Sequence, residues 1–454
     1  MSLYDLVIVN VKVLQPDFSI LDDATICISD GVIQKIETIP SRKANYESAE
    51  VIDGDGKLAM PGLVDAHTHA AQTLLRGSVV DELPMIWARI LVPFESSLTY
   101  EDNYAGSLLF CLQNLRAGIT TFADAGGPHS EAVAEAAIKT GIRAVITRST
   151  MDQGGFVPDS MKDTVSDAIS KTETLYEAYH GKGEGRINIW FGIRQAITTS
   201  PDLADAISIR SKELNTGVHA HLAEHLDEVS HCLSNYGLRP AEWFDRYNLL
   251  GPNFIGAHSV RLSAGEIDLM KDRNANAVHC PTSNLRSHGF SKTPLMLERG
   301  VNIGLGTDGG SGTRLDLFEQ MRLLKNAMHA RFGIEINDPI TVPTLELLKM
   351  ITLGGAKSVM LDQEIGSCEL GKKADIILLD VNRSHLSPTA DLPKTIALMG
   401  GPDDVSDVIV NGKVLMENRS FRNWDEDEIR HKAGEAMLRV GKFANLKFPA
   451  VYTG

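Results

Sequence analysis

Short apolar runs alternate with amphipathic helical patterns through most of the chain. From residue 61 onward there are eight such runs, at 61–69, 118–124, 144–147, 187–192, 217–221, 254–258, 277–280 and 301–306. Most are followed by a helical pattern, such as 130–140 or 263–271. Eight strands alternating with helices over about three hundred residues predict an α/β fold of the (β/α)8 TIM-barrel type. An open doubly wound sheet is the alternative, but no Gly-x-Gly-x-x-Gly turn follows a strand here.

Both chain ends show a different pattern, of short strands and turns. The strand-like runs lie at 6–9, 24–28, 32–36, 371–380 and 405–416, and the last folds back through Asn411-Gly412. Neither set can bury a face alone, so we expect one small β-sandwich domain built from both chain ends. The expected segments are 1–60 and 365–424 for the β-sandwich, 61–364 for the barrel, and 425–454 for a C-terminal helix and tail. That helix, at 425–443, has two places to pack, on the barrel or on a second subunit.

The composition of the chain argues against nucleic-acid-binding and membrane-spanning proteins. The chain has 454 residues, 43% of them hydrophobic, and a net charge of −15. This acidity argues against a nucleic-acid partner, which favours a basic surface. The sequence contains no apolar run long enough to span a membrane, and its first ten residues resemble a strand rather than a signal peptide. The five cysteines form no Cys-x-x-Cys pair, so we expect buried thiols in a reducing, cytoplasmic location. We also expect a homo-oligomer.

Polar residues that suit a metal site stand at the ends of several apolar runs. His67 and His69 are two residues apart, so a strand directs both to one face. His221 ends a later run in the pattern His-Ala-His-Leu-Ala-Glu224, and His258 and Asp308 end two more. Each has an ordinary structural explanation when taken singly. Together they predict a metal centre at the carboxyl ends of barrel strands, where such folds place their active sites.

Four motifs carry a resemblance to a known family. They are Pro61-Gly-Leu-Val-Asp-Ala-His-Thr-His69, Thr73-Leu-Leu-Arg-Gly77, His279-Cys-Pro-Thr-Ser-Asn284 and Gly306-Thr-Asp308. The sequence resembles the amidohydrolase superfamily over essentially the whole chain. The branch it resembles contains S-adenosylhomocysteine/methylthioadenosine deaminases, guanine and cytosine deaminases, and the s-triazine hydrolases that include chlorohydrolases.

The resemblance implies a role for each polar residue. His67, His69, His221 and Asp308 are expected to bind one divalent metal ion, Zn²⁺ with Fe²⁺ as the alternative. Glu224 and His258 are implied as proton shuttle and polarising group, and Asp308 as base. Superfamily members with two metals use a carboxylated lysine on the fourth strand, whereas the stretch 190–196 contains no lysine. We therefore expect a single metal, whose bound hydroxide attacks a ring carbon.

Three functions are compatible with these residues. We favour a hydrolytic deaminase that releases ammonia from an amino-substituted N-heterocycle. The second possibility is a hydrolase that releases chloride or an alkylamine from a triazine-like ring, or opens a cyclic amide. The least favoured is a non-catalytic scaffold, because all six metal and acid–base positions are filled.

The substrate pocket departs from the nucleoside-deaminase pattern. Such relatives carry a glutamate between the residues that match Pro84 and Trp87, and a Pro-His pair where this chain has Arg194-Gln195. The latter two are expected to donate hydrogen bonds to ring oxygens or nitrogens. The predicted substrate-binding residues are Trp87, Arg194, Gln195, Asn284, Arg286 and His288. We place an adenosine-like or S-adenosylhomocysteine-like substrate ahead of purine bases, pterins and triazines, with water as co-substrate.

Overall fold

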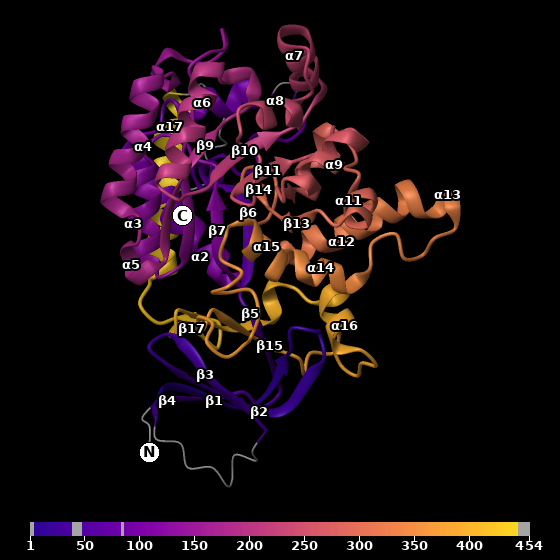
Figure 1. Cartoon of the computed structure of the whole chain (residues 1–454). Coiled ribbons are helices and arrows are strands. Elements are labelled where there is room, and N and C mark those ends of the chain that lie inside the picture. The colour runs from indigo at the N-terminus through magenta and orange to yellow at the C-terminus, as the bar shows by residue number, and fades with distance from the viewer. Residues whose placement is uncertain (1–3, 39–47, 83–85, 444–454) are drawn as a thin grey trace.

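The computed structural model describes residues 4–38, 48–82 and 86–443. Nine of its strands form a curled parallel sheet in the order β13-β12-β11-β10-β9-β8-β7-β6-β14 (Figure 1). Their bounds are β6 (Leu63–His69), β7 (Ile119–Asp124), β8 (Arg143–Thr150), β9 (Ile187–Ile193), β10 (Val218–Leu222), β11 (Phe254–His258), β12 (Asn276–His279), β13 (Asn302–Leu305) and β14 (Asp308–Gly309). All eight predicted apolar runs therefore contain a strand of this sheet.

The two ends of this sheet lie against the same strand. Only Gly306 and Thr307 separate β13 from β14. β14 pairs in parallel with β6, placing Asp308 opposite Thr68, and β13 also contacts β6. The approach is close, because a Cβ on Gly306 would lie 2.4 Å from the carbonyl oxygen of His67. A glycine at this position thus allows Asp308 to reach the strand that carries the two histidines.

Strands from both chain ends form a second, mostly antiparallel sheet. They are β1 (Tyr4–Leu14), β2 (Ile20–Ser29), β3 (Val32–Glu37), β4 (Ser48–Asp53), β5 (Lys57–Pro61), β15 (Ile376–Asp380), β16 (Val405–Val410), β17 (Lys413–Glu417) and β18 (Ser420–Phe421). β15 pairs antiparallel with β5, which leads through Gly62 into β6. The strand that carries His67 and His69 is therefore anchored at its start by the smaller sheet.

Helices follow most strands of the parallel sheet, as the alternation predicted. The longer ones are α2 (Tyr100–Arg116), α3 (Ser130–Thr140), α4 (Val165–Tyr179), α6 (Pro201–Glu213), α7 (Leu226–Tyr236), α8 (Pro240–Arg246), α9 (Ala264–Asp272), α11 (Thr293–Arg299), α12 (Leu317–Met328), α14 (Thr344–Ile351), α15 (Leu353–Ser358) and α16 (Leu392–Met399). The short ones are α1 (Val92–Glu95), α5 (Lys182–Gly185), α10 (Pro281–Ser283) and α13 (Ile334–Ile336). In the described part of the chain, no helix has the length and apolar character needed to span a membrane.

Helix α17 (Glu426–Phe443) packs on its own chain, the first of the two places that the sequence left open. It contacts α2 and the 3₁₀ turn Ala70–Leu75 that follows β6, and runs beside the helices of the larger domain in Figure 1. Ala433, Ala436 and Val440 are buried in that contact. The C-terminal helix therefore supports the segment that leads out of β6.

Candidate metal centre and active site

Three buried imidazoles from two strands converge at one end of the parallel sheet. His67 and His69 extend from β6 and His221 from β10, and one ring nitrogen of each lies within 4.8 Å of the others. The Nε2 atoms of His69 and His221 are 3.2 Å apart. The two-residue spacing thus places His67 and His69 on the same face, as predicted.

Asp308 completes this group. Its Oδ1 lies 3.6 Å from Nε2 of His67 and 3.6 Å from Nε2 of His69, a separation too long for a hydrogen bond. The backbone of Asp308 has φ +60°, in the left-handed region that few non-glycine residues adopt. The structure therefore brings together all four residues predicted as metal ligands.

The donor set fits a divalent metal ion. Nε2 of His67 is buried and has no hydrogen-bond partner within the described ranges. Burial holds the pKa values of His69 and His221 well below the usual histidine value, so both rings are present in the neutral, ligating form. Three imidazole nitrogens and one carboxylate are a common ligand set for Zn²⁺.

Glu224 lies among three imidazoles beside this group. Its Oε1 is 3.0 Å from Nε2 of His288 and 3.7 Å from Nε2 of His258, and its Oε2 is 3.8 Å from Nε2 of His225. Burial opposes ionisation, yet the nearby His258 and His288 hold the pKa of Glu224 well below its usual value. An ionised carboxylate here can accept a proton and pass it on.

Backbone strain accompanies the functional side chains at the strand ends. His258 has φ +67°, and Ala223, just before Glu224, has φ +47°. Such left-handed residues cost about 1–3 kcal/mol each and persist where surrounding structure holds them. Asn284 helps to hold His258, because its Oδ1 lies 2.9 Å from the ring Nδ1.

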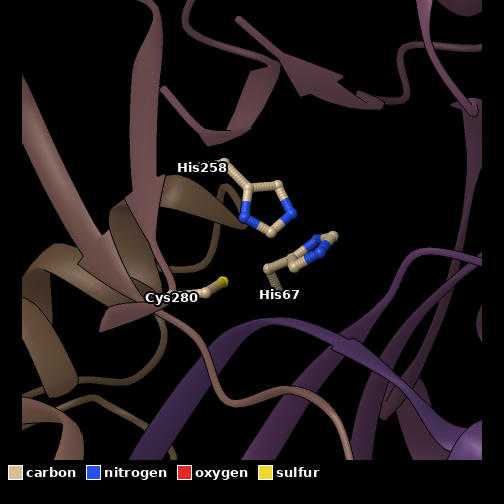
Figure 2. A group of neighbouring side chains, drawn as sticks. All are labelled: His67, His258 and Cys280. Carbon is tan, nitrogen blue, oxygen red and sulfur yellow. The ribbon is translucent and has the colours of Figure 1, made fainter. Parts of the chain in front are cut away.

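A second group of potential ligand atoms involves His67, His258 and Cys280. Figure 2 shows the Cys280 sulfur beside the two imidazole rings, whose centroids are 5.1 Å apart. Burial, together with the charges of Asp308 and Asp65, raises the pKa of this thiol well above its usual value. Cys280 therefore packs as a neutral side chain, in keeping with the expectation of buried thiols, and the three-histidine group is the better metal site.

A pocket of about 420 Å³ opens above these residues. It is lined by His69, His221, Glu224, His258 and Asp308, and by five of the six predicted substrate-binding residues. Those five are Trp87, Arg194, Gln195, Arg286 and His288. Asn284 is the exception: its contact with His258 suits a residue that positions the imidazole better than one that touches substrate.

Two glutamates hold the residues that follow β9. The buried Glu95 accepts a hydrogen bond from Arg194 Nη1 at 2.9 Å and one from Gln72 Nε2 at 2.9 Å. Gln195 Nε2 donates to Glu224 Oε2 at 2.6 Å. The amide nitrogen is therefore already engaged, whereas the sequence predicted that it would donate to the substrate. Glu95, Gln72 and His225 were not predicted as site residues, because no sequence motif distinguishes them.

The segment 81–89, where nucleoside deaminases carry an additional glutamate, is only partly covered by the described residues. Residues 83–85 lie outside the described residues. Trp87 begins the π-helical turn Trp87–Leu91 and lies at the pocket, edge-on to Phe156 with ring centroids 4.9 Å apart. The departure from the nucleoside-deaminase pattern between Pro84 and Trp87 therefore rests on the sequence alone.

Comparison with known proteins agrees with this geometry. The model of the amidohydrolase family matches residues 58–415. The chain belongs to the amidohydrolase family. The match starts in β5 and ends in β17, so it spans the metal-site strands and part of the smaller sheet.

Several similar amidohydrolase-like proteins have names that indicate an activity. A 5-methylthioadenosine/S-adenosylhomocysteine deaminase of Caldanaerobacter subterraneus subsp. tengcongensis is 36% identical, over 94% of this chain and 96% of the relative. A zinc-bound adenosine deaminase structure from Xanthomonas campestris is 26% identical with a TM-score of 0.90, covering 97% of this amidohydrolase and 99% of that chain. A triazine hydrolase variant is 25% identical with a TM-score of 0.86, covering 96% and 99%.

Proposed function

We propose that this amidohydrolase is a hydrolytic deaminase that removes an exocyclic amine from a nitrogen heterocycle. The observation that carries the proposal is the convergence of His67, His69, His221 and Asp308 beneath a pocket that Glu224 also lines. Three similar proteins named above are hydrolases of nitrogen heterocycles, two of them deaminases. The overall reaction converts a ring C–NH₂ and water into a ring C=O and ammonia.

We propose one divalent metal ion, Zn²⁺ in preference to Fe²⁺, held by the three histidines and Asp308. When bound, such an ion lowers the pKa of water to about 7 and so supplies a nucleophile at neutral pH. The zinc bound in the Xanthomonas campestris structure supports this choice. The stretch 190–196 contains no lysine, which supports one metal rather than two.

The chain's own residues account for the proton transfers. The Asp308 carboxylate accepts a proton from the attacking water. Glu224, ionised in the free site, takes up the other proton of this water and transfers it to the ring nitrogen next to the reacting carbon. The proton first held by Asp308 then passes through Glu224 to the departing amine, so the two protons of water account for both transfers. His258 lies between Asn284 and Glu224, where it can hold the attacking oxygen.

An ammonia-release screen tests this function. Its substrates are adenosine, methylthioadenosine, S-adenosylhomocysteine, guanine, 8-oxoguanine, cytosine, pterin and melamine. Ammonia from at least one of them supports the proposal. If no substrate releases ammonia and substituted triazines release chloride or an alkylamine, the protein is instead a hydrolase of triazine-like rings. The similarity to a triazine hydrolase is the reason to include this alternative. A non-catalytic scaffold would release neither product.

We also propose the finer architecture that the sequence predicts. β13 and β14 would act as one interrupted strand that closes an eight-stranded TIM barrel over residues 61–364, since both contact β6. Segments 1–60 and 365–424 would form a β-sandwich, supported by a buried cluster that joins Ile8, Ile26, Ile376 and Ile409, and 425–454 would be the C-terminal helix and tail. The homo-oligomer and the cytoplasmic location stay predictions.

A further inference from the structure

Arg194 is fixed in the pocket by a buried carboxylate. Glu95 is fully buried and Arg194 is 4% exposed. Nη1 and Nη2 of Arg194 lie 2.9 and 3.4 Å from the two oxygens of Glu95. Each of these nitrogens carries a second N–H, and Arg194 lines the pocket. Because Glu95 already balances its charge, Arg194 offers these N–H groups to a neutral carbonyl oxygen rather than to an anion.

Gln195 offers the opposite hydrogen-bonding group. Its Nε2 is 2.6 Å from Glu224 Oε2 and 3.2 Å from Nε2 of His225. A carboxylate only accepts hydrogen bonds, so the contact with Glu224 fixes which end of the amide carries the oxygen. Oε1 of this 2% exposed side chain has no partner in the part of the chain that the structure describes. A buried acceptor without a donor is costly, and a ligand N–H would satisfy it.

We propose that Arg194 and Gln195 together recognise a lactam edge, –NH–CO–, on the substrate ring. Arg194 donates to the ring carbonyl and Gln195 Oε1 accepts the adjacent ring N–H. This inference rests on the proposed function, and it names the substrate class as amino-oxo heterocycles, such as 2-amino-4-oxopteridines or 2-amino-6-oxopurines. The step remains ring C–NH₂ plus water to ring C=O plus ammonia, and the lactam itself is unchanged.

An adenine ring fits these two residues less well. In a nucleoside its only base donor is the exocyclic amine, which is the group removed. No second donor on the base would then remain for Gln195 Oε1. Glu95 acts as a positioning residue in this arrangement, because it is fully buried and holds Arg194. Gln72 in turn donates a hydrogen bond to Glu95.

Ligand binding tests the lactam edge without turnover. Xanthine carries lactam edges and no exocyclic amine, whereas purine lacks both. We expect titration calorimetry on the metal-loaded protein to show xanthine binding about 30-fold more tightly than purine, as two hydrogen bonds imply. Gln195→Leu should reduce this ratio several-fold. The matched control is Gln153→Leu, since Gln153 holds the same loop through the carbonyls of Ile197 and Thr199 and should leave the ratio unchanged.

Turnover separates this inference from the proposed function. Guanine and 2-aminopurine share the 2-amino group, and only guanine has the lactam, so we expect ammonia from guanine or pterin at least 30-fold faster, in kcat/KM, than from 2-aminopurine or adenosine. Ammonia from adenosine with equal binding of xanthine and purine would overturn the lactam edge and leave deamination standing. Tighter binding of xanthine than of purine, with no ammonia from any substrate, would support the lactam edge and overturn the proposed deamination. Circular dichroism shows whether Gln195→Leu folds. If it does not, the wild-type protein still tests the inference: an affinity for xanthine less than about three times that for purine overturns it.

Discussion

Nδ1 of His67 lies 2.8 Å from Nε2 of His219, and both side chains are buried. One of these nitrogens must donate a proton to the other. If His67 binds a metal through Nε2, its proton is on Nδ1, and His219 is the acceptor that fixes this tautomer and the ring orientation. His219 is thereby a positioning residue for the proposed metal centre.

Removing that acceptor should weaken metal binding. Contacts of this kind typically account for 10- to 100-fold in metal affinity, so we expect His219→Ala to raise the metal dissociation constant by about that factor. Competition with a chelator of known affinity measures the effect. His231→Ala is the control, because the His231 ring lies 3.2 Å from Nδ2 of Asn235 on the same helix, α7. Unchanged metal affinity in His219→Ala would contradict the assigned tautomer.

Asp308 should be indispensable for both metal binding and turnover. We expect the purified protein to contain close to one equivalent of Zn²⁺ or Fe²⁺, and Asp308→Ala to lose most of it together with all activity, because one carboxylate serves as ligand and base. Elemental analysis and an ammonia assay on the same preparation check both effects. Two tightly bound metal ions per chain, or full activity after exhaustive chelation, would contradict this.

Glu224→Gln should retain the metal and lose most of the rate. The amide fills similar space but cannot relay a proton, and general acid–base steps contribute roughly 10²–10⁴-fold. His258→Asn should behave similarly. Steady-state kinetics alongside metal analysis separates these variants from Asp308→Ala. A loss of less than about tenfold would remove Glu224 from the proton transfers.

The metal-site geometry was predictable because strand periodicity and strand ends are local properties. The two-residue spacing of His67 and His69 defines one face of a strand, and Asp308 follows the end of β13 after only Gly306 and Thr307. The partners of these residues were not predictable from the sequence. Glu95 meets Arg194 across 99 residues, and nothing in the local pattern around either residue indicates an ion pair.

Residue type alone also left the direction of hydrogen bonds open. A glutamine can donate or accept, and only the contact of Gln195 with Glu224 shows which end of the amide is already used. His225 illustrates the same limit. The structure places its ring at the pocket, stacked with Trp87 at a centroid distance of 6.0 Å, and no pattern in the sequence indicates this position.

Glu228 should make stability depend on pH. Its side chain is buried and accepts a hydrogen bond from the Glu224 amide at 3.0 Å. Burial, with the charge of Glu224, raises the pKa of Glu228 from 4.5 to about 8. The folded state thus binds this proton more tightly than the unfolded chain. Its contribution is complete below about pH 4.5 and is lost as the pH rises towards about 8, by at most about 1.4 kcal/mol per pH unit.

Glu228→Gln removes this titration while keeping an acceptor for the Glu224 amide. We expect its urea midpoint to vary less than that of the wild type between pH 5 and pH 8. Urea unfolding at three pH values in this window, on both proteins, provides the comparison. Parallel curves for the two proteins would show that Glu228 ionises normally.

A buried ion pair joins the parallel sheet to the strands of the C-terminal end. Arg143 begins β8, and its Nε and Nη2 donate to the two carboxylate oxygens of Asp375 at 2.7 and 3.0 Å. Each side chain is 1% exposed. Asp375 also accepts a hydrogen bond from the amide of Asn411 at 2.8 Å. Because breaking such a pair strands an unpaired charge, we expect Asp375→Ala to cost about 3–5 kcal/mol of unfolding free energy.

The exposed pair of Lys12 and Asp22 is the matched control, since its side chains are 42% and 63% exposed and pairs of this kind contribute about 0–1 kcal/mol. Urea unfolding of Asp375→Ala and Asp22→Ala therefore compares a buried with an exposed aspartate in one protein. The double variant Arg143→Met/Asp375→Leu should recover much of the loss, because it leaves neither charge unpaired. A cost for Asp375→Ala no larger than that for Asp22→Ala would mean that the ion pair does not hold the two sheets together.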